Sequence, residues 1–338
     1  MTPPVPHIAA AGSALPGDPV DNTALSAALG ISAEWIEVYI GTQTRHFARD
    51  LLTGEIRHSL ADLCARAAAQ AMERCAAEPA DIEFLVLGTA TPDHLMPTTA
   101  SRVADLLGLD QLPTYQLQSG CAGAVQALDL ARLLITGGGY RCGLAIGGDV
   151  CTKHLDVDRD MSAAAPGDLV NAVLFGDGAG AAVLTADPQG PALLRTLNRC
   201  TGLGREPGQI IDWFGLADRH EDRQALTEDY KAIEENIPVM AVEILWELLD
   251  DLDWSPDDLD FLLPPQLSGR MTRLITEQLA VPSARPISCV DRTGNNGNAL
   301  PFLQIEQLLP QMSGGQRALA VAVESSKWIK SGFALQKP

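Results

Sequence analysis

The residues most suited to covalent chemistry lie in the segment Gln118–Ala124, which reads QSGCAGA. Cys121 follows a tight turn of small residues and stands where a helical pattern begins. A thiol at a helix start lies near the positive end of the helix dipole, so we expect its thiolate to be stabilised. The backbone N–H of Cys121 is also placed to donate to a developing oxyanion, as acyl transfer requires. Taken alone, the segment is equally consistent with a buried cysteine that packs a helix rich in glycine and alanine.

Strand and helix patterns alternate on both sides of this cysteine, which predicts an α/β layered fold. A helical period over 59–77 leads to an apolar strand at 82–88, and a short strand at 115–118 leads to the cysteine turn. The next helix is expected to run from about Cys121 to the three glycines at 137–139, which are a natural C-terminal stop.

The second half of the chain repeats this order of elements. A long helix leads to an apolar strand, a second strand precedes a turn rich in glycine and asparagine, and a third strand follows. These elements are expected at 232–252, 259–263, 286–290 and 317–323. The stretch 201–230 has weak periodicity, and we interpret it as a long loop that borders the site.

The composition excludes several classes of function. A formal net charge of −19, from 24 basic and 43 acidic residues, argues against nucleic acid and membrane surfaces as partners. No signal peptide is recognisable, and no apolar run is long enough to span a bilayer. The 7 cysteines form no CxxC pair and no zinc-ligand spacing, so we expect reduced thiols in a cytoplasmic protein that uses no metal or redox cofactor.

Several blocks of the sequence resemble the β-ketoacyl-acyl carrier protein synthase III group of thiolase-like enzymes. In chain order they are SAEWI, the loop TATPDHLMPTTA, SGCAGA, FGDGAG and DRTGN, and together they span nearly the whole chain. The resemblance implies a thiolase-like five-layered αβαβα sandwich of two similar halves, a homodimer, and Cys121 as the nucleophile. We place the halves at 1–186, which carries Cys121, and 187–338, which carries Asn295.

The resemblance also implies a departure in the catalytic set. Condensing members of the family use Cys, His and Asn, and the last two hold the thioester oxygen of a malonyl unit while CO2 leaves. Asn295 matches the asparagine, but Pro265 stands where the family has histidine. Proline offers no side-chain donor and no backbone N–H. Losing one such donor slows a reaction about a hundredfold or more, whereas acyl loading needs only the nucleophile and an oxyanion hole.

Transfer from Cys121 to an acceptor requires a base. Three histidines are candidates: His220 in the long loop, His154 after a predicted strand, and His94 in the TATPDHLMPTTA loop. A structural or solvated role is the more ordinary interpretation of each.

Other positions bear on how the acyl donor binds. Tyr39 stands where the family has an arginine that packs on the adenine of coenzyme A, so Trp35 and Tyr39 are expected to stack on that ring. Arg159 is a candidate for the donor's phosphates, or a solvated surface residue. A backbone amide near Ser326 is expected to supply the second oxyanion donor, which comes from a Gly-rich loop in the family.

The donor is alternatively carried on a protein. Arg270 and Arg273 lie on the predicted helix after Pro265, where the family presents its carrier-binding face. An ordinary solvated helix face is the other interpretation, since carrier proteins are acidic and so is this chain.

The sequence therefore predicts an acyltransferase. It takes an acyl group from a coenzyme A or acyl-carrier-protein thioester onto Cys121 and passes it to an alcohol, amine or thiol, in natural-product biosynthesis of the polyketide type. Two alternatives stay open. One is a decarboxylative condensing enzyme with another residue in place of the histidine, and the other is a non-catalytic partner subunit of a thiolase-like heterodimer.

Overall fold

The computed structural model of the chain describes residues 3–154, 166–212 and 226–338. Its centre is a 10-stranded sheet in the order β12-β11-β13-β14-β8-β1-β7-β6-β4-β5. The first half supplies β1 (His7–Ala14), β4 (Leu85–Gly88), β5 (Thr114–Leu117), β6 (Cys142–Asp149) and β7 (Gly178–Thr185). The second half supplies β8 (Ala192–Cys200), β11 (Phe261–Leu263), β12 (Arg285–Pro286), β13 (Arg317–Glu324) and β14 (Ile329–Gln336).

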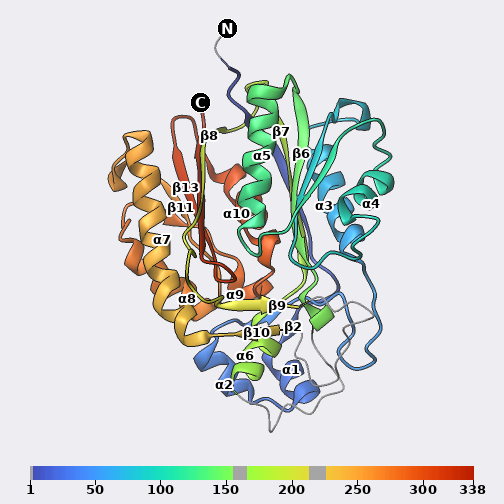
Figure 1. Cartoon of the computed structure of the whole chain (residues 1–338), viewed down its shortest axis with the longest axis vertical. Helices are drawn as coiled ribbons and strands as arrows, with labels where there is room; N and C mark the ends of the chain where they lie inside the picture. The colour runs from blue at the N-terminus through green and yellow to red at the C-terminus, as the bar shows by residue number, and fades with distance from the viewer. Residues whose placement is uncertain (1–2, 155–165, 213–225) are drawn as a thin grey trace.

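Helices lie between and outside the two halves of this sheet, which gives five layers (Figure 1). The central layer consists of α5 (Gly123–Gly138) and α10 (Leu300–Leu308). One outer layer consists of α3 (Leu60–Arg74) and α4 (Thr99–Leu106), and the other of α7 (Tyr230–Leu252) and α8 (Gly269–Leu279). The predicted thiolase-like sandwich is confirmed.

Shorter elements gather at the end of the sandwich where α2 and α6 are drawn in Figure 1. The helices among them are α1 (Asn22–Leu29), α2 (Ala33–Tyr39), α6 (Pro166–Leu174) and α9 (Val290–Thr293). The strands are β2 (Val20–Asp21), β3 (Thr44–Arg45), β9 (Gln209–Ile211) and β10 (Leu226–Glu228).

The two halves of the sheet share one pairing scheme. In the first half β4 is parallel to β5 and β6, while β7 is antiparallel to β6 and β1. In the second half β11 is parallel to β12 and β13, while β14 is antiparallel to β13 and β8. The halves join through the pair of His7 with Ala192. The duplicated order expected from the sequence is present, and the boundary between 186 and 187 stays a prediction.

Local signals account for the predicted helices. Ser59 and Asp62 form a capping box at the start of α3, and Gly139, at φ 79°, takes the left-handed conformation that ends α5. The predicted start of α5 at Cys121 is wrong, because the helix begins at Gly123. Ser119, Gly120 and Cys121 instead form a turn in which Gly120 has a φ of 51°.

Two further predictions need correction. The strand expected at 286–290 is only β12. Its last ladder bond runs from the N–H of Ile287 to Leu262, and the chain then turns into α9 at Val290. The stretch 201–230, expected as a loop, contains the paired strands β9 and β10.

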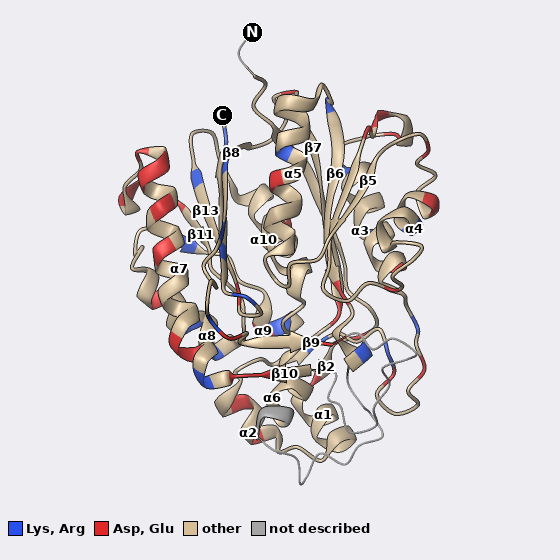
Figure 2. Ribbon diagram, viewed as in Figure 1, with Lys and Arg blue, Asp and Glu red and all other residues tan. Residues whose placement is uncertain are grey.

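Several acidic residues lie on α7, where the ribbon is red at several places in Figure 2. The helix α8, which carries Arg270 and Arg273, packs against α7. Within residues 3–154, 166–212 and 226–338, no helix is both long and apolar enough to cross a lipid bilayer.

Candidate active site

The loops that follow the parallel strands bring the candidate residues to one edge of the sheet. Cys121 follows β5, Pro265 follows β11, and Asn295 follows the short helix α9. Glu324 is the last residue of β13, and Asp149 is the last residue of β6, its counterpart in the first half. Because the carboxyl ends of parallel strands meet at the same edge, these side chains lie close together.

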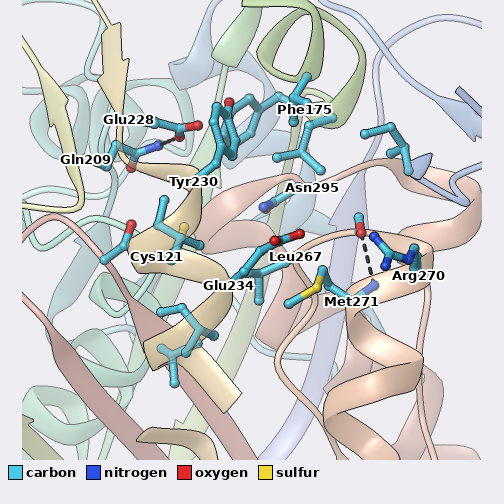
Figure 3. A pocket seen from close by; sticks show the side chains of 18 of the residues that line it. Cys121, Phe175, Gln209, Glu228, Tyr230, Glu234, Leu267, Arg270, Met271 and Asn295 are labelled. Atoms are coloured by element: carbon cyan, nitrogen blue, oxygen red, sulfur yellow. Dashed lines mark hydrogen bonds between the residues drawn. The ribbon is translucent and has the colours of Figure 1, made fainter. Parts of the chain in front are cut away.

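Cys121 lines a cavity of about 250 Å³. Most of the wall is apolar and comes from α2, α6, α7 and α8, as well as from β9 and β10 (Figure 3). Two smaller cavities of about 40 Å³ also reach Cys121, one beside Pro265 and one beside His154. The cysteine is therefore accessible to a ligand and is not sealed in hydrocarbon.

A polar relay positions the turn that carries Cys121. The carboxylate of Asp149 accepts hydrogen bonds from the backbone N–H of Asn298 at 2.9 Å and from its Nδ2 at 2.8 Å. Asn298 Oδ1 in turn accepts from the backbone N–H of Ala124 at 2.7 Å, in the first turn of α5. Asn298 thus caps a donor that the helix itself leaves unpaired.

The carboxylate of Glu324 lies directly against this turn. Its Oε2 accepts a hydrogen bond from the backbone N–H of Cys121, and its Oε1 accepts one from the backbone N–H of Ser326 at 2.6 Å. A Cβ atom at Gly120 would lie 2.0 Å from Oε2, so this approach requires glycine there. Glu324 is only 2% exposed. One carboxylate therefore occupies both amides expected to bind the oxyanion.

The expectation of a stabilised Cys121 thiolate is wrong. Burial raises the pKa of the thiol well above its ordinary value, and the negative charges of Glu324 and Asp149 and a hydrogen bond to Glu324 raise it further. The helix dipole acts in the opposite sense, but it is outweighed because the sulfur is buried among carboxylates. In this structure the resting form of Cys121 is the neutral thiol.

Asn295 reaches the cavity from a fixed backbone. Its N–H donates to Leu174 at 3.0 Å, its carbonyl accepts from Gly176 at 3.1 Å, and its Oδ1 accepts from Gly297 at 3.0 Å. The amide nitrogen points into the cavity (Figure 3). Pro265 lines the smaller cavity that Asn295 and Cys121 share, and it presents a saturated ring there.

A second carboxylate, Glu228 at the end of β10, faces the same cavity. Its Oε1 accepts a hydrogen bond from Nε2 of Gln209 on β9 (Figure 3). Burial raises the pKa of Glu228, and the nearby charge of Glu324 contributes in the same direction. The stretch 201–230 thus supplies a second carboxylate to the wall of the site.

Comparison with known proteins identifies the family. The family models for 3-oxoacyl-acyl carrier protein synthase III and for its C-terminal region match residues 115–202 and 249–325. A β-ketoacyl-acyl carrier protein synthase III of Rhizorhabdus wittichii is 31% identical, with 85% of each chain covered. The chain belongs to the β-ketoacyl-acyl carrier protein synthase III family.

Solved structures extend this result. A tetronic acid condensing enzyme, AbyA1, is 53% identical with a TM-score of 0.95, covering 98% of this chain and 99% of that one. The synthase III of Pseudomonas aeruginosa is 27% identical with a TM-score of 0.85, covering 99% of this chain and 98% of that one. The priming β-ketosynthase of a polyketide pathway is 25% identical with a TM-score of 0.83, at the same coverage.

The structure places most of the donor-binding residues expected for this synthase III family member at the cavity. Trp35 and Tyr39 line it and stack on each other, with ring centroids 5.5 Å apart. Arg270 also lines it, and Arg273 is exposed one turn further along α8. Ser326 contributes its backbone N–H to Glu324. The binding roles of these residues stay predictions.

The candidate bases lie at different places in the structure. His154 lines a small cavity together with Cys121, and burial lowers its pKa, so its neutral form is favoured. His94 lies instead in a different cavity, where its Nε2 is 3.3 Å from a guanidinium nitrogen of Arg102. His220 and Arg159 lie outside the residues that the structure describes.

The sequence interpretation did not identify Glu324, Glu228 or Gln209 as members of the site. A signal was present for Glu324, because a carboxylate directly follows the apolar run 317–323, where the resemblance predicts the start of the Gly-rich loop. No comparable signal marks Glu228, which is brought to Cys121 only by the pairing of β10 with β9.

Proposed function

We propose that this chain accepts an acyl group from a coenzyme A or acyl-carrier-protein thioester on Cys121 and transfers it to an acceptor that bears a hydroxyl group. The transfer belongs to a ring-forming condensation of the tetronic-acid type. The observation that carries this proposal is the 53% identity, over 98% of the chain, to a tetronic acid condensing enzyme.

The chemistry of such a ring agrees with the residues at the site. A tetronic acid is a five-membered lactone, which can form from a hydroxyacyl thioester and a β-ketoacyl thioester. One new C–C bond and one new C–O ester bond release two thiols. The carbon between the two carbonyls of a β-ketoacyl thioester loses a proton readily, so the reaction does not require loss of CO2.

Because the reaction does not require loss of CO2, it is compatible with a proline at position 265. If Pro265 occupies the position of the family histidine, the site lacks half of the pair that stabilises the enolate left by decarboxylation. A nucleophilic thiol, an oxyanion hole and a base suffice for acyl transfer. Cys121, Asn295 and the carboxylates around them support that chemistry.

The proposal is tested by mass spectrometry. Incubation with β-ketoacyl and simple acyl thioesters should add the acyl mass to the protein, and Cys121→Ala should not acquire it. Adding a hydroxyacyl thioester should then release a product with the mass of the tetronic acid. A wild-type protein that no thioester in the panel acylates would refute the proposal.

The second candidate, decarboxylative condensation, is favoured by the likeness to the Rhizorhabdus wittichii synthase. Its arm of the experiment supplies malonyl-carrier protein to the acylated enzyme. Release of CO2 with a β-ketoacyl product supports this candidate over the first.

A further inference from the structure

The two backbone N–H groups expected to bind the oxyanion both donate to one negatively charged carboxylate. Both donate to Glu324, one from Cys121 and one from Ser326. A tetrahedral intermediate at Cys121 carries its own negative oxygen and needs at least the first of these donors. A charged carboxylate and an oxyanion repel each other at such close range. Acyl transfer therefore requires Glu324 to lose its charge or to leave.

Glu324 is also in contact with the group whose proton must be removed. Its Oε2 accepts the backbone N–H of Cys121, and the charge of the carboxylate raises the pKa of the thiol on the same residue. Among the described residues that line the 250 Å³ cavity, no histidine or lysine is present. The groups there that can accept a proton are carboxylates, and Glu324 is the one bonded to the backbone of Cys121.

We propose that Glu324 is the general base of Cys121, and that taking up the thiol proton is what opens the oxyanion hole. This inference rests on the proposed acyl transfer through Cys121. It assigns the proton-accepting role, left open by Pro265, to a carboxylate at the end of β13.

The proton balance closes over one acyl loading. As the sulfur attacks the donor carbonyl, its proton passes to Glu324, and the neutral carboxyl group gives up the Cys121 N–H to the new oxyanion. Collapse of the tetrahedral intermediate breaks the donor C–S bond, and the proton moves from Glu324 to the departing thiolate. The products are acyl-Cys121, a free thiol and the original carboxylate. The same cycle serves the second transfer, when a hydroxyl group attacks acyl-Cys121 and the sulfur regains a proton.

The other acidic groups around Cys121 are engaged elsewhere. Asp149 is 2% exposed, and its oxygens accept bonds from the loop 89–91 and from Asn298. Glu228 accepts a hydrogen bond from Gln209 on β9. Both raise the thiol pKa through their charge, whereas Glu324 alone among the three also bonds to the amide of Cys121.

The experiment measures two rates on Cys121, of which only the first should fall when the base is removed. The first is acylation by acyl thioesters of coenzyme A and N-acetylcysteamine, followed by intact mass in a single turnover. The second is alkylation by iodoacetamide, which needs the thiolate but no oxyanion hole and no proton for its leaving group. The variant is Glu324→Gln, which keeps the shape of the side chain, and the control is Glu73→Gln, a matched change at an exposed position on α3.

In Glu324→Gln, acylation should be about a hundredfold slower or more, the usual effect of losing a general base. Alkylation should be equally fast or faster, because removal of the negative charge lowers the pKa of the thiol. Glu73→Gln should leave both rates unchanged. If both rates rise, Glu324 only obstructs the site, and its role as a base is overturned.

Two further comparisons cover the remaining outcomes. If Glu324→Gln has a lowered melting temperature, Glu324→Asp is compared with Glu324→Ala, and added formate is tested with the latter. A faster Asp variant and rescue by formate support the role of Glu324 as a base, whereas equal rates without rescue overturn it.

A wild-type protein that is alkylated but never acylated refutes both the proposed function and the role of Glu324 as a base. An acylated wild type with an equally fast Gln variant refutes the base alone.

Discussion

Asp149 and Asn298 are joined by two hydrogen bonds across 149 positions of sequence, and both residues are fully or almost fully buried. Asp149 ends β6 in the first half of the chain, and Asn298 lies in the turn before α10 in the second. Through Ala124 this pair holds the first turn of α5, next to Cys121. The placement of the nucleophile thus depends on a contact between the two halves.

Replacing Asn298 with alanine should destabilise the fold by about 2 kcal/mol, because it leaves the Ala124 N–H without its partner and removes one donor to Asp149. Acylation of Cys121 should slow as well. Urea unfolding and single-turnover acylation measure the two effects. Gln278→Ala, at an exposed position of α8, should change stability by less than about 0.5 kcal/mol.

Gly120→Ala should lower the rate of Cys121 acylation at least about tenfold, because the added Cβ would lie 2.0 Å from the Glu324 carboxylate and displace the turn. Gly108→Ala is its matched control. Gly108 has a similar φ, 66°, but nothing lies within 4 Å of an added Cβ, so only backbone strain of about 1 kcal/mol is expected. Equal acylation rates in the two variants would show that the contact with Glu324 is unimportant.

Pro265→His should introduce decarboxylation of a malonyl thioester, because an imidazole beside Asn295 restores a donor to the shared cavity. The expected gain in CO2 release is about tenfold or more over wild type. Radiolabelled malonyl-carrier protein provides the measurement. Pro265→Ala should show no gain, and a gain in both variants would attribute the effect to loss of the ring.

Alkylation of Cys121 should be slow at neutral pH and should increase only at a pH above that of an ordinary thiol. Burial together with the charges of Glu324, Asp149 and Glu228 raises its pKa, so the reactive thiolate forms late in the titration. Peptide mass spectrometry after iodoacetamide treatment at several pH values gives the profile for this residue. A profile shifted to lower pH than that of a free thiol would contradict the assignment of a neutral resting thiol.

Arg273→Glu should weaken use of a carrier-bound donor by about tenfold in KM and leave use of the N-acetylcysteamine thioester unchanged. Arg273 is exposed on α8, so a reversed charge there repels an acidic carrier without altering the cavity. Arg285→Glu, exposed on β12, provides the control for net charge. Equal effects of the two variants on the carrier-bound donor would place the carrier elsewhere.

Much of the fold follows from local patterns. The apolar runs that become β4, β6 and β13 and the capping signals of α3 depend on neighbouring residues, so they can be recognised in one sequence. Boundaries that depend on tertiary contacts were less accurate. The helix α5 begins at Gly123 and not at the predicted Cys121, because the turn before it packs against Glu324.

The sequence by itself determined the nucleophile candidate, since a cysteine in a turn of small residues before a helix is a local arrangement. It also determined the family, through blocks spread along the chain. Only the tertiary structure decided the protonation of that cysteine and its proton acceptor. Cys121 and Glu324 are 203 positions apart, and their contact exists because β5 and β13 direct their carboxyl ends to the same edge of the fold. The residues next to Cys121 in the sequence do not predict this contact. Burial and charge at the contact nevertheless set the pKa of the Cys121 thiol.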